Sequence, residues 1–96
     1  MTTLQRLQHW LQRNYNDTWD HGEAISIETL DDPGWAVRVD LRGTTLEQTP
    51  LAESKVEHSA DDWTVIRRTA TSFEARGGLG NLEDLLVAFL DWADEG

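Results

Sequence analysis

The chain has 96 residues and a formal net charge of −10, which comes from 18 acidic and 8 basic side chains. This length fits one domain over residues 1–96 with one hydrophobic core, and it leaves little room for a deep enzyme cleft. The negative charge disfavours nucleic acid and anionic membranes as partners, and the absence of cysteine excludes disulfides, thiolate nucleophiles and cysteine-ligated zinc.

The first predicted element is an amphipathic helix over residues 3–16. Its apolar side chains recur at spacings of three and four, so they share one helical face: Leu4, Leu7, Trp10, Leu11 and Tyr15. The first six residues lack the basic and apolar regions of a signal peptide, and no apolar run approaches the ~20 residues of a membrane span. We therefore expect a cytoplasmic protein.

A β-hairpin follows the first helix. Residues 24–30 and 35–42 alternate apolar and polar side chains with the period of a strand. Between them, Asp31-Asp32-Pro33-Gly34 combines a proline that fixes φ with a glycine that tolerates positive φ, as a tight turn requires. The polar face of the second strand is expected to be largely solvated, and it carries Ala36, Arg38, Asp40 and Arg42.

The second half of the chain predicts two or three further strands and a final helix. The strands lie around Val56, over residues 63–69 and around Phe73, with turns at Asp61-Asp62 and near Thr71. Asn81 can cap a helix whose wide apolar face consists of Leu82, Leu85, Leu86, Phe89, Leu90 and Ala93. The whole pattern predicts an α+β fold, in which an antiparallel sheet of about four to five strands has an N-terminal and a C-terminal helix packed on one face.

Two patterns invite a catalytic or ligand-binding interpretation. The glycines of residues 77–80 precede a helix, as in phosphate-binding loops, but no lysine follows them and Glu83 and Asp84 would repel a phosphate. Asp20, His21 and His58 offer oxygen and nitrogen ligands for a small metal-dependent hydrolase. On a strand, however, Asp20 and His21 would face opposite ways, which favours a structural His21. We expect no catalytic residue, metal or cofactor, and keep the hydrolase as an alternative.

The five tryptophans are large enough to dominate either a core or an interface. Trp10, Trp35 and Trp63 fit core positions by their spacing. Trp19 and Trp92 lie near the ends of the predicted helices. The pattern favours a role for both in closing the core, and the alternative is that either one anchors a partner.

Acidic side chains gather at positions where local stability does not require them. Asp91, Asp94 and Glu95 crowd the C-terminal end of the last helix, where the helix dipole prefers cations. With the aspartates of the two turns, they are candidates for acidic rims that contact a basic partner. A solvated charge run is the alternative explanation.

A series of motif residues spans nearly the whole chain. It consists of Trp19-Asp20-His21, Ile25, Ile27, Glu28-Thr29-Leu30-Asp31, Pro33-Gly34-Trp35, Asp40-Leu41, Gly43-Thr44, Leu46, Asp62-Trp63, Phe73, Asn81-Leu82 and Phe89 through Trp92. In this order the residues resemble the immunity protein 53 family of bacterial polymorphic toxin systems, with Asp20 and Ala24 departing from the expected glutamate and glycine. The resemblance implies an α+β protein that binds a toxin encoded beside it and so protects the producing cell.

The leading hypothesis is therefore a non-enzymatic immunity protein that neutralises a cognate toxin by stoichiometric binding. Its partner is expected to be basic, and a nuclease is a guess from charge. A general acidic adaptor is the alternative outside enzymes. The residues expected to contact the partner are Trp19, Asp20, His21, Asp31, Asp32, Asp61 and Asp62.

Overall fold

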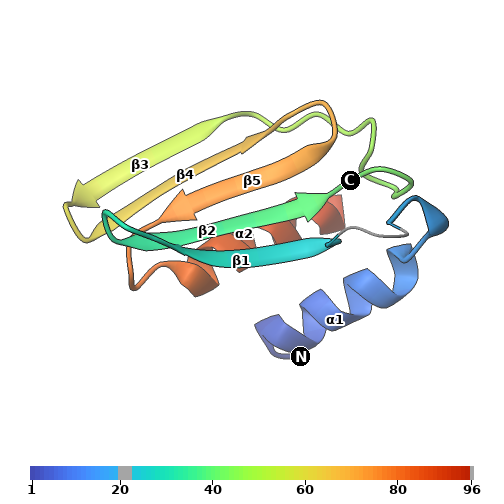
Figure 1. Cartoon of the computed structure of the whole chain (residues 1–96), viewed down its shortest axis with the longest axis horizontal. Coiled ribbons are helices and arrows are strands. Elements are labelled where there is room, and N and C mark those ends of the chain that lie inside the picture. The colour runs from blue at the N-terminus through green and yellow to red at the C-terminus, as the bar shows by residue number, and fades with distance from the viewer. Residues whose placement is uncertain (20–22, 96) are drawn as a thin grey trace.

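Strands and helices follow one another in the predicted order in this computed structural model, which describes residues 1–19 and 23–95 (Figure 1). Over these residues the elements are helix α1 (Thr3–Asn14), a short 3₁₀ helix (Asp17–Trp19), strands β1 (Ile25–Leu30), β2 (Gly34–Asp40), β3 (Ser54–Ser59), β4 (Asp62–Arg68) and β5 (Ser72–Gly77), and helix α2 (Leu82–Glu95). The predicted α+β class is confirmed, because both helices lie on one side of a five-stranded antiparallel sheet.

The sheet has the strand order β1-β2-β5-β4-β3, and every neighbouring pair is antiparallel. The last strand in sequence, β5, is therefore the central one. Gly77 at its end pairs with Trp35 at the start of β2 and with Thr64 near the start of β4. As a result, the β1–β2 turn, the β3–β4 turn and the β5–α2 loop lie at the same end of the sheet (Figure 1).

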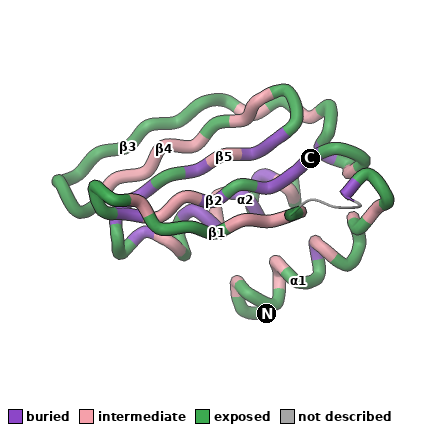
Figure 2. Tube along the Cα trace, viewed as in Figure 1, coloured by how far each residue is buried: buried purple, intermediate pink, exposed green. Residues whose placement is uncertain are grey.

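The core lies between the sheet and α2, and its buried segments run along β2, β5 and α2 (Figure 2). Phe73 from β5 and Phe89 from α2 are both fully buried, with ring centroids 5.0 Å apart and edges directed at faces. Trp10 of α1 meets the same Phe89 at 4.9 Å. Edge-to-face pairs of this kind add to the large apolar area that each ring removes from water.

Four of the five tryptophans contribute to this core or lie against it. Trp10, Trp19 and Trp92 are buried, and Trp35 is half-buried and packs against the core cluster. The prediction that Trp19 and Trp92 close the core is confirmed. The indole N–H of Trp92 donates a hydrogen bond to the Pro50 carbonyl oxygen at 2.9 Å. This bond satisfies the one polar atom of the side chain, which would otherwise be buried without a hydrogen-bond partner.

The core prediction for Trp63 is wrong. Strand β4 directs Thr64, Ile66 and Arg68 to the helix side, where their partners on β5 are Gly77, Ala75 and Phe73. Because side chains alternate along a strand, Trp63 lies on the opposite face, where it is half-buried. The face of the sheet that points away from α2 is called the open face below.

The acidic C-terminal end of α2 is held by a base from the other helix. The Arg6 guanidinium lies 3.1 Å from the carboxylate of Asp91 and 2.8 Å from that of Asp94, and both carboxylates raise the pKa of Arg6. In the first turn of α2, Glu83 accepts a hydrogen bond from the Thr3 hydroxyl at 2.8 Å. Much of the unexpected acid at the C-terminal end of α2 therefore serves to join α1 to α2.

The long connection from β2 to β3, residues 41–53, is fastened to the sheet by Arg68. Its guanidinium donates to the carbonyl oxygens of Leu46 at 3.0 Å, Glu47 at 2.9 Å and Thr49. Leu46, which belongs to this connection, is fully buried. An arginine has five N–H donors in a fixed plane, so it can satisfy several loop carbonyls that no strand partner would reach.

One expectation for the outer face of β2 also fails. Asp40 is only 4% exposed rather than solvated, and its carboxylate pairs with Arg42 through an Nη2–Oδ2 distance of 2.6 Å. The backbone N–H of Arg42 donates to the same carboxylate at 2.9 Å. Together these hydrogen bonds lower the pKa of Asp40, because they stabilise its charged form.

The central aromatic pair yields a stability prediction. Phe73→Ala should lower the free energy of unfolding by about 3–5 kcal/mol, because it removes a fully buried ring and leaves a cavity against Phe89. Val56→Ala, at an exposed position on the edge strand β3, should cost about 0.5 kcal/mol. Urea unfolding of both variants measures the difference, and equal losses would contradict the placement of the core.

The Asp40–Arg42 pair yields a pH prediction. Asp40→Asn should lose about 1 kcal/mol at neutral pH, a modest amount because Arg42 is half-exposed and the pair is screened. Since the folded pKa of Asp40 is depressed, its contribution is present above the unfolded pKa of about 3.9 and is lost as the pH falls through the folded value. Unfolding curves of both proteins should therefore converge in acid, and a difference that grows on acidification would contradict the assignment.

Candidate functional site

Four of the predicted contact residues lie at one end of the sheet, called here the acidic end. Asp31 and Asp32 occupy the β1–β2 turn, Asp61 occupies the β3–β4 turn, and Asp62 is the first residue of β4. All four are exposed, and the antiparallel order places both turns at this end (Figure 1). The structure thus brings together two aspartate pairs that are 30 residues apart in the sequence.

Two glycines allow the backbones to approach closely at the acidic end. A Cβ atom on Gly34 would collide with the carbonyl oxygen of Gly77, and one on Gly78 would collide with that of Asp61. The Gly78 N–H also donates to the Trp63 carbonyl oxygen at 3.2 Å. Gly77 and Gly78 therefore serve close packing within a strand-to-helix connection, whereas a Cβ on Gly80 would meet nothing within 4 Å.

Asn81, 5% exposed, connects the turn to the helix. Its side-chain oxygen accepts from the Trp63 backbone N–H at 3.3 Å, and its amide nitrogen donates to Asp62 at 3.0 Å and Asp84 at 2.9 Å. Asn81 also accepts the first intrahelical hydrogen bond, from Leu85 at 3.1 Å. Asn81 thus holds the N-cap position of α2 through its backbone carbonyl, whereas its side chain bonds the start of β4 and does not accept from a helix N–H as predicted.

A shallow groove of about 340 Å³ lies between the two turns and is called here the turn groove. Its lining includes the half-buried ring of Trp63 and the exposed Pro33, with Asp32 beside them. The complete lining is Asp32, Pro33, Lys55, Glu57, Ala60, Trp63 and Val65. Sequence reasoning missed Trp63 as a surface residue, although its position directly after Asp62 at the start of a strand was the available signal.

Of the remaining predicted contacts, the structure describes only Trp19, and this residue does not join the acidic end. Trp19 is 3% exposed and packs against Trp10 and Tyr15 at ring distances of 6.1 Å and 5.9 Å. Asp20 and His21 lie outside the described residues. Trp19 is therefore a core residue in this structure and offers no exposed anchor.

The described residues also contain no preformed metal site. Within residues 1–19 and 23–95, no group of three histidine, aspartate or glutamate side chains is placed to hold an ion. His58 is exposed on β3, close to the acidic end. The carbonyl oxygen of Ala24 accepts a hydrogen bond from the Asp40 backbone N–H at 2.8 Å.

The family model described as Immunity protein 53 matches residues 4–94. The chain belongs to the immunity protein 53 family. No curated protein and no solved structure matches it. The match covers all five described strands and all but one residue of each of α1 and α2, so it applies to the fold as a whole.

Membership of the immunity protein 53 family decides between two of the sequence-based alternatives. An immunity family is non-enzymatic, so the chain is not an enzyme and the hydrolase alternative is removed. The family implies a toxin as the partner of this immunity protein. Neither helix in the described ranges is both long and apolar enough to cross a membrane.

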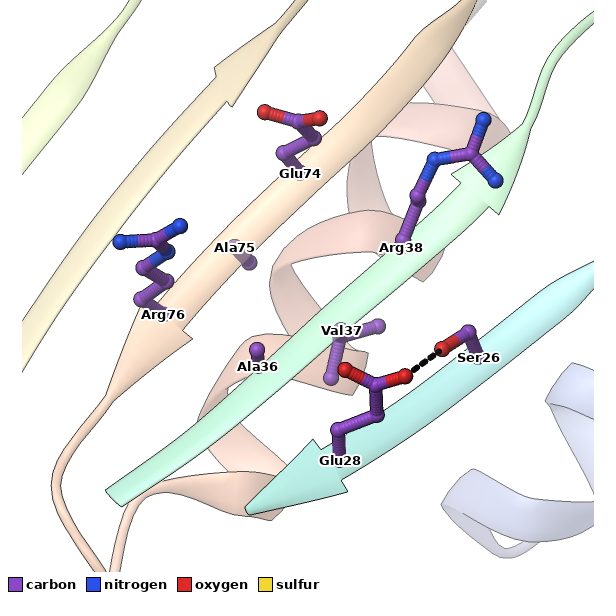
Figure 3. A pocket seen from close by; sticks show the side chains of 8 residues that line it. All are labelled: Ser26, Glu28, Ala36, Val37, Arg38, Glu74, Ala75 and Arg76. Atoms are coloured by element: carbon purple, nitrogen blue, oxygen red, sulfur yellow. Dashed lines mark hydrogen bonds between the residues drawn. The ribbon is translucent and has the colours of Figure 1, made fainter. Parts of the chain in front are cut away.

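The open face of this immunity protein has a different electrostatic character from the acidic end. It carries four of the chain's 8 basic side chains, Arg38, Lys55, Arg67 and Arg76, among the acidic Glu28, Glu53, Glu57 and Glu74, while Asp40 on the same face is paired with Arg42. Figure 3 shows the charged side chains of Glu28, Arg38, Glu74 and Arg76 on three neighbouring strands, where they line a hollow of about 200 Å³. Arg67 and Glu74 pair at 2.8 Å. Positive and negative charges balance here, so the surplus negative charge lies elsewhere.

The role of Asn81 at the acidic end can be tested by comparing Asn81→Ala with a control variant that removes the N-cap of α1. Asn81→Ala should lower the free energy of unfolding by about 1–2 kcal/mol, because it leaves the Trp63 amide without its acceptor and removes the hydrogen bonds to Asp62 and Asp84. Hydrogen exchange at that amide should also become faster. Thr2→Ala removes the N-cap of α1 at a similar energetic cost but should leave the Trp63 amide protected. Unchanged exchange in Asn81→Ala would show that Asn81 does not fix the turn.

Proposed function

We propose that this chain binds a cognate polymorphic toxin domain and neutralises it by forming a stoichiometric protein complex. Membership of the immunity protein 53 family is the observation that carries the proposal. Residues 1–96 act as one binding domain in the cytoplasm of the cell that carries the toxin gene. Blocking by association requires an exposed, well-positioned surface and no reacting groups.

The acidic end is the surface that best fits this task. Asp31, Asp32 and Asp61 are exposed, and their turns are supported by close backbone contacts and by the Asn81 hydrogen bonds. A surface held in place before binding loses less conformational entropy when the complex forms. Asp62 belongs to the same surface, although one of its carboxylate oxygens is already bound by Asn81.

Two further residues keep their place in the proposal through the family motif. Asp20 and His21 are part of the tryptophan-acid-histidine segment, so we retain them as contacts. Trp19 is removed from the contact set, because its burial makes it a support for that segment.

The charge of the chain favours a basic toxin. A net charge of −10 attracts a basic partner over a distance and raises the rate of encounter. If the toxin is a nuclease, carboxylates of the acidic end would occupy the place of substrate phosphates. Binding of this kind denies the toxin its substrate without changing it chemically.

Co-expression with the toxin domain encoded beside this gene tests the proposal. Cells should survive only when this chain is present, and the two proteins should elute from a sizing column as a complex with equal amounts of each. Association should slow when salt is raised from about 50 mM to about 500 mM, because the Debye length shortens. Continued killing with no complex would refute the proposal.

The acidic end itself is tested by charge-neutralising variants. Asp31→Asn/Asp32→Asn/Asp61→Asn should weaken binding by about tenfold or more, since these residues contact the partner directly. Asp17→Asn, in the 3₁₀ helix near the opposite end, also removes an exposed acidic charge and should change the affinity by less than about twofold. If each removed charge lowered the affinity equally at both places, the net charge of the chain and not the acidic end would account for binding.

A further inference from the structure

We propose that the turn groove receives one lysine or arginine side chain of the toxin, which packs on the ring of Trp63 and pairs with Asp32. This inference rests on the proposed function and identifies the chemistry at the centre of the contact. It adds Trp63, Pro33 and Lys55, which no family or sequence argument assigned to binding.

The position of Trp63 is the first observation that supports this inference. Four of the five tryptophans are in or against the core, whereas the alternation of β4 places Trp63 on the open face. Its ring is half-buried and lines the groove together with Val65 and Pro33. An aromatic ring with an apolar surround and one accessible side is typical of the anchors that dominate protein interfaces.

The charge around the groove determines which side chain fits. Asp32 and Glu57 line it, Asp31 and Asp61 lie in the turns on either side, and Asp62 begins β4 next to Asp61. A cation over the face of tryptophan is attracted by the ring and, here, by the nearby carboxylates as well. An acidic side chain would be repelled, and an apolar one would leave Asp32 less hydrated without a partner. Charge complementarity therefore selects a basic occupant.

Lys55 allows the inference to predict the direction in which a substitution changes the affinity. It is the one basic residue in the groove lining, and it is exposed on the edge strand β3. Its ammonium group competes with an incoming cation for Asp32 and Glu57, and it repels that cation directly. Removing the Lys55 charge should therefore strengthen the binding of a basic side chain.

The test measures the affinity of purified variants for the toxin domain encoded beside this gene, by calorimetric titration at fixed salt. Trp63→Ala should weaken binding by about tenfold or more, and Asp32→Asn by about threefold to tenfold. Lys55→Gln should strengthen it by about twofold to fivefold. Asp17→Asn, far from the groove, should stay within about twofold of the original protein.

Two further measurements separate binding from folding. Trp63→Phe keeps an apolar ring with a weaker attraction for cations, so it should bind with an affinity between those of the original protein and Trp63→Ala. Circular dichroism and thermal melting should show that each variant is folded. The indole N–H signal of Trp63 should also shift on titration with acetyl-Gly-Arg-Gly-amide and stay in place with acetyl-Gly-Gln-Gly-amide.

The outcomes distinguish this inference from the proposed function. If the original chain forms a complex but Trp63→Ala and Asp32→Asn bind equally well, the groove assignment is overturned and the immunity function stands. If Lys55→Gln weakens binding, the occupant is not a cation and the inference fails. If the original chain forms no complex at all, both proposals fall.

Discussion

The constraint on which the rest of the structure depends is that all deep apolar burial lies on one face of the sheet. Phe73 on the central strand β5 meets Phe89 of α2, and Trp10 of α1 meets the same ring. Both helices must therefore lie on that side, since only there can their apolar faces leave water. The open face and the turns at the acidic end remain uncovered, and they are the surfaces available for a partner.

The distribution of charge follows from this one-sided core. The open face balances its basic and acidic side chains, as the Arg67–Glu74 pair illustrates. At the C-terminal end of α2, Arg6 neutralises part of an acidic group that the helix dipole disfavours. The acidic end has fewer compensating bases, with Lys55 in the groove beside it. Repulsion between its aspartates is tolerated because close backbone packing and Asn81 hold the turns in place.

An acidic end whose turns are held by close packing suits the proposed function, in which the chain acts by binding alone. Immunity function requires neither a cavity nor a reactive group, and the hollows on this molecule are shallow. What it requires is a surface whose shape changes little on association, so that the contacts are not offset by ordering costs. The Arg68 hydrogen bonds give similar support to the long connection between β2 and β3 at the other end of the sheet.

The sequence by itself determined the elements and the family, because periodicity and turn chemistry are local. The alternation around Asp31-Asp32-Pro33-Gly34 predicted the hairpin, and the spacing from Leu82 to Ala93 predicted α2. Only the tertiary structure decided that β5 is central, that both aspartate pairs share one end, that Trp19 is buried and that Trp63 is on the open face. Each of these depends on which strands pair and in which register, and a shift of one residue would exchange the two faces of a strand. Such pairings join residues far apart in the chain, so no local pattern specifies them.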